Sequence, residues 1–384
     1  MSVFNNRAAL LAAVALLATS ACGGNGSVPS SAGVGNPALQ LSIPQGGAAS
    51  PADTTSILKK FKKDVVIGST VDPTNGDTGP HSLSQSSLNY GKIKKGQLLV
   101  CNFADSSGTA GNGTTVEVLN PTPGSKPTTF VTDSRFNGCD GAAVTSANHV
   151  YAAGQTGGLI AGYDQKAKFI KSYGSPYISA PFAEVDASNP SLYSAEYIYA
   201  GDSKNGSIVS FSVNLYGNPN ENPGVTGFAV NNGTGWGVLG PSGLAYYKHA
   251  DTLYVVDGVK NTLVAIDHAS NLLQPSEIVV QPDGKTFKCK HPRVTCGKLV
   301  YSGSPLNAPV AAALLPNGNL IVANTVGGNK LVEISAAGKL LATKSVDKSS
   351  IAHVFALHAA GTTDSNTVLF YTTTKDNTVH ELEQ

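Results

Sequence analysis

One pattern recurs six times along this chain: an apolar β-rich segment, a polar turn and a second alternating segment. The six pairs are 98–102 with 115–119, 150–154 with 159–163, 198–202 with 208–211, 253–257 with 263–267, 320–324 with 331–334, and 368–372 with 378–382. Val, Ile, Leu and Tyr fill the segments, and Gly, Asn, Asp and Lys fill many of the turns, so each pair predicts a β-hairpin. Hairpins that recur every 48 to 67 residues are typical of the four-stranded blades of a β-propeller.

Short segments rich in small residues precede several hairpins, at 138–144, 240–246 and 307–312. Small side chains suit the innermost strand of a blade, because all blades converge there on one axis. A β-sandwich, the alternative all-β fold, would not require six similar units. The 42 Gly, 21 Pro and 13% charged residues also fit a turn-rich all-β chain better than a helical one.

The two ends of the repeat array predict how the ring closes. The sixth copy ends at Gln384, directly after its third strand, so its blade lacks a fourth strand. The β-like segment left unassigned is 57–67, near the other end of the array. Placing it as the missing outer strand joins the first and last blades and removes an exposed edge. The sequence therefore predicts an all-β, six-bladed propeller over residues 55–384, closed by an N-terminal strand.

The first residues predict export. Arg7 precedes an apolar run at 8–18, and small residues at 19–21 precede Cys22, which is the order of a secretory signal peptide. A Cys at this place resembles a bacterial lipoprotein signal, in which that Cys is lipidated and becomes the new N-terminus. The alternative is an ordinary signal peptide with an incidental Cys; we favour the lipoprotein interpretation. Residues 1–21 are then the signal peptide.

Residues 22–54 are rich in Gly, Ser, Ala, Pro and Asn and predict a flexible tether, because they cannot bury enough apolar surface to become ordered. The expected location is the bacterial cell envelope, with membrane contact only through the lipid on Cys22. Gly23 resembles the residue that follows the lipidated Cys in outer-membrane lipoproteins, if the cell has two membranes. The net charge of +1 gives no case for a nucleic-acid partner, and we expect a monomer.

Four cysteines remain after Cys22, and an even number in an exported chain predicts two disulfides. Cys101 ends a predicted second strand and Cys139 starts the next innermost strand, so the alternation of strand direction brings both to one end of neighbouring blades. Cys289 and Cys296 flank a short loop in the insertion between the fourth and fifth copies, and their bridge is expected to order that insertion only. The alternative for each pair is buried free thiols.

Polar residues gather at the same predicted rim. His353, His81 and Asp140 start innermost strands of three consecutive blades, and two imidazoles with a carboxylate are a donor set for a divalent metal. The alternative, which we favour, is that these side chains meet water; we predict no cofactor beyond this candidate metal. Residues at the ends of second strands form a second set: Asn102, Asp202, Asp257 and Asn324. These either line a ligand-binding funnel or cap their own hairpin turns, and we favour turn caps.

The chain resembles the NHL-repeat family of propellers through Pro241-Ser242-Gly243-Leu244-Ala245 with Tyr254-Val255-Val256-Asp257, and it is also similar to uncharacterised exported bacterial propellers. Such a resemblance implies a fold and leaves function open. The preferred expectation is a non-enzymatic platform that binds a protein, peptide or glycan of the envelope. The alternative is a metal-dependent hydrolase, or a lactonase like those of the SMP-30 type, with its site in the axial funnel. The lactonases supply a metal-binding Glu from their first inner strand, and 79–83 here contains none.

Overall fold

The computed structural model describes residues 55–174, 176–188, 196–213 and 220–384. The predicted signal peptide (1–21), the lipidation site Cys22 and the predicted tether (22–54) lie outside these residues. No helix in the described part of the chain is long and apolar enough to cross a membrane.

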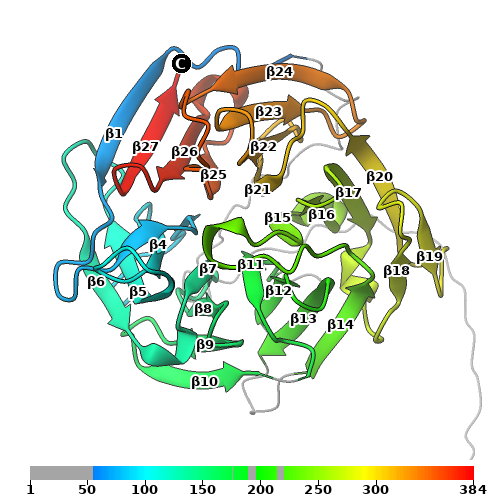
Figure 1. Ribbon diagram of the computed structural model, residues 1–384, viewed down its shortest axis with the longest axis horizontal. Coiled ribbons are helices and arrows are strands. Elements are labelled where there is room, and N and C mark those ends of the chain that lie inside the picture. Colours follow the sequence, from blue (N-terminus) through cyan, green and yellow to red (C-terminus); the bar gives the residue numbers. More distant parts are fainter. Residues whose placement is uncertain (1–54, 175, 189–195, 214–219) are drawn as a thin grey trace, which may run out of the picture. The chain divides into compact units, whose positions relative to one another are not determined.

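Six sheets, in which the strands of each blade are antiparallel, surround one axis in the described residues, which confirms the six-bladed propeller (Figure 1). Blade one contains β2 (Thr78–Pro80), β3 (Ser84–Gln85), β4 (Leu98–Ala104), β5 (Ala110–Leu119) and β6 (Thr128–Thr132). Blade two contains β7 (Cys139–Val144), β8 (Val150–Gly154), β9 (Leu159–Tyr163) and β10 (Phe169–Tyr173). Blade three contains β11 (Pro181–Asp186), β12 (Glu196–Asp202), β13 (Ser207–Val213) and β14 (Asn220–Thr226).

The second half of the ring follows the same plan. Blade four contains β15 (Pro241–Tyr247), β16 (Thr252–Asp257), β17 (Thr262–Asp267) and β20 (Cys296–Ser302). Blade five contains β21 (Pro309–Leu314), β22 (Leu320–Asn324), β23 (Lys330–Ile334) and β24 (Leu340–Ser345). Blade six contains β25 (Leu357–Ala360), β26 (Val368–Thr373), β27 (Thr378–Glu383) and β1 (Lys63–Ser69). The described 3-10 helices are η1 (Ser134–Phe136), η2 (Gly235–Gly237), η3 (Lys248–Ala250), η4 (Ala269–Asn271) and η5 (Asp364–Asn366).

Each predicted hairpin forms the second and third strands of a blade. In blade four, for example, β16 pairs with β17 from Thr252 opposite Asp267 to Asp257 opposite Thr262. The apolar core lies between neighbouring blades, because each sheet packs its faces against the sheets beside it. One cluster joins Tyr151 of blade two to Phe211 of blade three, with ring centroids 5.8 Å apart. Repetition of this packing around the axis is what the six sequence copies specify.

The two ends of the ring differ in what they carry. We call the end where innermost strands begin and second strands end the upper face, and the opposite end the lower face. The connectors from one blade to the next cross the upper face, and the Cys101–Cys139 bridge lies on that side. Because β1 is antiparallel to β27, with Lys63 opposite Glu383 and Ser69 opposite Thr378, the described chain enters the ring at the lower face.

The predicted closing strand is confirmed, with shifted limits. β1 occupies Lys63–Ser69 and completes blade six, whereas residues 57–60 form a turn instead of extended strand. The buried side chains of Ile57, Leu58 and Phe61 pack between blades five and six. The cause of the turn is Glu333 on β23, whose carboxylate accepts hydrogen bonds from the backbone N–H groups of Ile57 (3.1 Å) and Leu58 (2.9 Å). Glu333 is fully buried, so this contact replaces the water that its charge would otherwise need.

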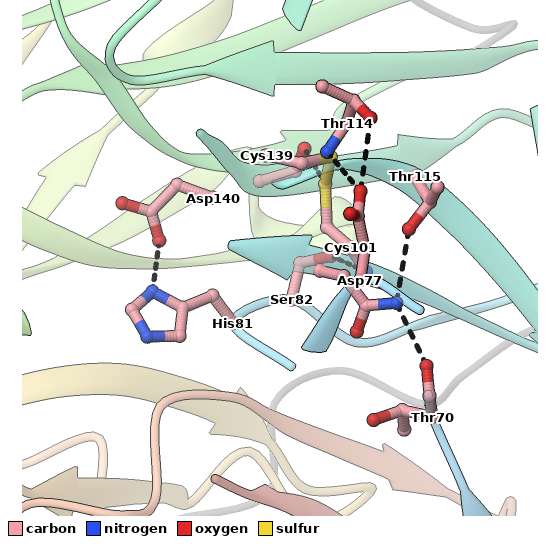
Figure 2. The surroundings of a disulfide bond; sticks show 11 residues. Thr70, Asp77, His81, Ser82, Cys101, Thr114, Thr115, Cys139 and Asp140 are labelled. Carbon is pink, nitrogen blue, oxygen red and sulfur yellow. Dashed lines mark hydrogen bonds and ion pairs between the residues drawn. A yellow bond between two sulfur atoms is a disulfide. The ribbon is translucent and has the colours of Figure 1, made fainter. Parts of the chain in front are cut away.

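Both predicted disulfides are present. Cys101 on β4 is bonded to Cys139 on β7, with Cα atoms 5.3 Å apart, and this bridge joins blades one and two (Figure 2). Cys289 is bonded to Cys296, with Cα atoms 5.5 Å apart. The insertion that holds Cys289 forms the hairpin β18 (Ile278–Val280) and β19 (Phe287–Cys289), and β18 pairs in parallel with β14 of blade three. The second bridge therefore also links two blades, a wider role than the sequence predicts.

Candidate functional site

The axial channel is lined by the innermost strands of all six blades, and small residues keep it narrow. Gly243 faces the backbone of blade five so closely that a Cβ there would lie 2.8 Å from the Ala311 Cα. A Cβ on Gly141 would lie 3.0 Å from the Phe182 carbonyl oxygen. The small residues noted in the sequence therefore allow neighbouring blades to pack closely around the axis. The channel contains an upper cavity of about 70 Å³ and a lower cavity of about 330 Å³.

An aromatic plug closes the upper end of the channel; we use this name for His81, Phe103, Trp236 and Phe355. The His81 ring is stacked between Phe103 (centroids 4.3 Å apart) and Phe355 (4.0 Å). Trp236 reaches the cluster from the connector between blades three and four, with its centroid 5.1 Å from that of His81. Gly79 makes room for it, because a Cβ at that position would lie 2.6 Å from the Trp236 ring.

Within the plug, His81 forms a buried pair with Asp140 (Figure 2). His81 Nδ1 donates to Asp140 Oδ1 at 2.7 Å, and the two side chains are 2% and 0% exposed. Gln155 Nε2 donates to Asp140 Oδ2, also at 2.7 Å. Burial raises the pKa of Asp140, although His81 acts in the opposite direction. His81 Nε2 is buried and has no hydrogen-bond partner among the described residues.

A carboxylate that holds Nδ1 leaves Nε2 as the atom that can take or give a proton, as in the His–Asp part of a catalytic triad. Here that atom is buried beside the aromatic rings of the plug. The hydroxyls nearby are engaged with backbone: Ser82 Oγ accepts from the Cys101 N–H, and Ser242 Oγ donates to the Gly240 carbonyl.

The predicted metal set is not assembled. His353 lies on the upper face, where its Nδ1 donates to Asp347 Oδ2 at 2.6 Å and its backbone N–H donates to Asn329 Oδ1. Burial alone would raise the pKa of Asp347, whereas the hydrogen bond with His353 lowers it. The net result is a pKa below the usual value. No group of three His, Cys, Asp or Glu side chains in the described part of the chain is placed to hold a metal ion. The metal-site hypothesis is wrong for His353, because the ring of this loop residue is hydrogen-bonded to the carboxylate of Asp347 instead.

Two of the four rim residues, Asp202 and Asp257, cap their own hairpin turns. Asp202 Oδ1 accepts from the N–H groups of Lys204 and Asn205, and Asp257 Oδ1 accepts from those of Val259 and Lys260. Asp202 Oδ2 also accepts from the N–H groups of Ser179 and Ala180 in the connector before blade three.

The turn-cap prediction is wrong for the two Asn residues. Asn102 donates to the Thr70 carbonyl at 2.8 Å, and Asn324 accepts from the Asn307 N–H at 3.0 Å while donating to the Pro305 carbonyl. A side-chain amide can both donate and accept hydrogen bonds, so it can bind the carbonyl groups as well as the N–H groups of an adjoining connector. An ionised carboxylate can only accept hydrogen bonds.

The lower cavity carries ionisable residues that the sequence interpretation missed. Glu184 and Asp186 lie two positions apart on β11, and His358 lies on β25 across the ring. Their signal in the sequence is a charged residue inside an otherwise small and apolar innermost strand, as in Phe182-Ala183-Glu184-Val185-Asp186. Such residues are costly to bury and therefore mark positions where function is to be sought.

His358 predicts an acid-sensitive stability. Burial lowers its pKa to about 4, whereas a His in the unfolded chain titrates near 6.5. Between these values the unfolded state binds the proton and the folded state does not, so stability falls as pH drops from about 6.5 to 4, by up to about 3 kcal/mol. The free energy of unfolding of wild type and His358→Gln, compared from pH 7 to 4 by urea denaturation, should diverge over this range. Parallel curves would contradict the assignment.

Comparison of this chain with solved structures finds proteins of the same propeller fold. A gluconolactonase from Xanthomonas campestris is 13% identical, covers 89% of this chain and 99% of its own, and has a TM-score of 0.54. A catalytically inactive virginiamycin B lyase from Staphylococcus aureus, solved with quinupristin, is 14% identical, with 84% and 99% coverage and a TM-score of 0.50. No protein-family model and no curated protein sequence matches the chain. At these identities the likeness establishes the fold alone.

Proposed function

We propose that this chain is an exported, lipid-anchored propeller that works as a binding platform in the bacterial envelope. Its partner would be a protein, peptide or glycan, held at the upper face. Two disulfides favour an oxidising compartment outside the cytoplasm. We retain the NHL-like relationship as part of this proposal, on the module of residues 241–245 and 254–257.

The observation that carries the proposal is the point where the described chain enters the ring. Thr55 is the first described residue, and β1 runs from the lower to the upper face. An anchor on Cys22 would therefore attach the domain through its lower end, and this attachment favours the upper face as the one left accessible to a partner. This geometry suits a partner in the envelope space better than one within the bilayer.

The upper face also has side chains suited to contact. Its connectors and hairpin turns expose large apolar or aromatic residues at Tyr177 (41%), Trp236 (38%), Val326 (50%) and Ile351 (66%). Leu88, Tyr90 and Leu273 are similarly exposed at the lower face, so exposure by itself does not choose between the faces. The proposed anchor favours the upper face, and the exposed residues there would supply the contact area that aromatic and apolar side chains give an interface.

The enzymatic alternative is supported by the fold that this chain shares with the gluconolactonase and the lyase. The candidate metal set of His81, Asp140 and His353 is not brought together in the described residues. Metal analysis of the purified chain still discriminates between the two classes. Stoichiometric calcium, zinc or manganese would overturn the platform proposal in favour of a metal-dependent hydrolase or lactonase.

The anchor itself is tested by Cys22→Ser. Cells producing this variant should release the protein from the membrane fraction, because a serine hydroxyl cannot accept the lipid that is transferred to the Cys22 thiol. The measurement is the partition of the chain between membrane and soluble fractions, with Cys289→Ala/Cys296→Ala as a matched control that keeps Cys22. A Cys22→Ser chain that stays with the membrane would place the anchor elsewhere.

The binding face is tested by matched substitutions. Val326→Asp and Ile351→Asp place a charge on the upper face, and Leu273→Asp, at an equally exposed site, does so on the lower face. Co-sedimentation with envelope fragments should be saturable for wild type and Leu273→Asp and at least tenfold weaker for the two upper-face variants. Protease or glycan-degrading treatment of the fragments then identifies the partner class. Equal loss in all three variants, or none, would contradict the proposal.

A further inference from the structure

The lower cavity opens at the lower face. On β11, Phe182 is buried, whereas Glu184 and Asp186, farther along the strand, are half-buried. The same gradient occurs on β25, where Leu357 is buried and Ala359 is half-buried. The aromatic plug lies at the opposite, upper end of the channel. The lower cavity, of about 330 Å³, falls at the lower end of the volumes of small-molecule sites.

Asp186 supplies the negative charge of this cavity. Its lining contains Glu184, Asp186 and His358 and includes no Lys or Arg from the described part of the chain. Burial raises the pKa of Asp186 to about 6, which leaves it ionised at neutral pH, and Glu196 and Lys248 act on it with opposite effects. His358 is neutral there, because burial lowers its pKa to about 4.

Glu184 and Asp186 differ in what their carboxyl groups can reach. Burial raises the pKa of Glu184 well above its usual range, although the Ala143 amide acts in the opposite direction, and both of its carboxyl oxygens are buried in the wall. Asp186 Oδ1 accepts from the Ser188 N–H at 3.0 Å and from the Ser188 hydroxyl. The Asp186 side chain is half-buried and lines the cavity. Asp186 is thus the charged group that a ligand can meet.

The rest of the wall is mostly apolar. It consists mainly of Ala, Val and Leu side chains from the innermost strands, and Ser84, Gln85 and Tyr246 are its polar members. Such a wall accommodates a short alkyl chain, whose transfer from water is favourable by about 0.8 kcal/mol for each CH₂ group. A metal ion fits poorly, because no three suitable side chains in the described residues are close enough together.

We propose that this cavity binds a small organic ammonium ion, with the ammonium group at Asp186 and the alkyl part against the apolar wall. His358, from the opposite side of the ring, offers a neutral imidazole to a second polar group of the ligand. The site lies at the end opposite the proposed platform surface. Its success or failure is therefore independent of the binding-platform proposal.

Calorimetric titration of the purified chain with three probes of similar size tests this site: n-butylammonium chloride, butan-1-ol and sodium butyrate. The ammonium should bind saturably at one site, the alcohol at least tenfold more weakly, and butyrate not detectably. Asp186→Asn should weaken the ammonium at least tenfold and leave the alcohol unchanged. Asp283→Asn, which removes an exposed carboxylate elsewhere, should leave all three titrations unchanged.

A second variant keeps the test decisive if Asp186→Asn is unstable. Ala359→Leu adds volume inside the cavity without changing charge and should weaken both the ammonium and the alcohol. Equal affinity for the ammonium and the alcohol in wild type would overturn the proposal. So would unchanged ammonium binding in either folded variant.

Discussion

Deleting residues 55–67 is expected to lower the free energy of unfolding by several kcal/mol, enough to leave the propeller largely unfolded. The deletion removes four buried apolar side chains: Ile57, Leu58, Phe61 and Ile67. At about 1.5–3 kcal/mol for each fully buried side chain, their loss amounts to roughly 6 kcal/mol or more. It also removes most of β1 from the edge of blade six and leaves Glu333 buried without its Ile57 and Leu58 donors. Typical domains have only about 5–15 kcal/mol of stability to lose.

Urea denaturation followed by circular dichroism measures this effect. Deleting residues 23–50 instead should change stability little, because that segment is expected to make no packed contacts. Glu333→Gln, which keeps shape but loses charge, should lie between these limits, at about 1–3 kcal/mol. If the two deletions behave alike, residues 55–67 do not close the ring.

Removing the Cys101–Cys139 bridge has the second-largest expected effect. This disulfide closes a sequence separation of 38 residues, against 7 for Cys289–Cys296. The loop-entropy relation gives about 4 kcal/mol for the longer loop and about 2 kcal/mol for the shorter. Cys101→Ala/Cys139→Ala should therefore lose more stability than Cys289→Ala/Cys296→Ala, although both bridges join neighbouring blades.

Thermal and urea unfolding of the two double variants gives the comparison, and non-reducing peptide mapping of wild type should recover the 101–139 and 289–296 pairs alone. Pairing of Cys139 with Cys289 or Cys296 would contradict the blade order. Equal stability losses would show that loop length does not govern the effect of these bridges.

The blade plan was predictable because its determinants are local and repeated. Each hairpin carries its own alternation and turn residues, and six copies reinforce one interpretation. The Cys101–Cys139 bridge followed from strand alternation alone. The closing strand was predictable in place but not in limits, since the turn at 57–60 depends on Glu333, more than 270 residues away.

The candidate sites were harder to predict because they depend on contacts that sequence spacing does not encode. His353, like His81, was placed at the start of a blade, but its imidazole ring is hydrogen-bonded to the nearby Asp347. Trp236 reaches blades one and six from a connector after blade three, a distance across the ring that no local pattern reveals. Asp186 lies in a strand that the sequence analysis did not single out, and the cavity shows that its charge has a place to act.

Amide hydrogen exchange, measured with and without saturating envelope fragments, tests the binding-platform claim most directly because it maps the contact without any substitution. Exchange should slow in the upper-face connectors 176–180, 227–240 and 346–356, while the lower-face connectors 86–97 and 268–277 keep their rates. Slowed exchange confined to the lower-face connectors, or no change in either set at saturation, would contradict the account.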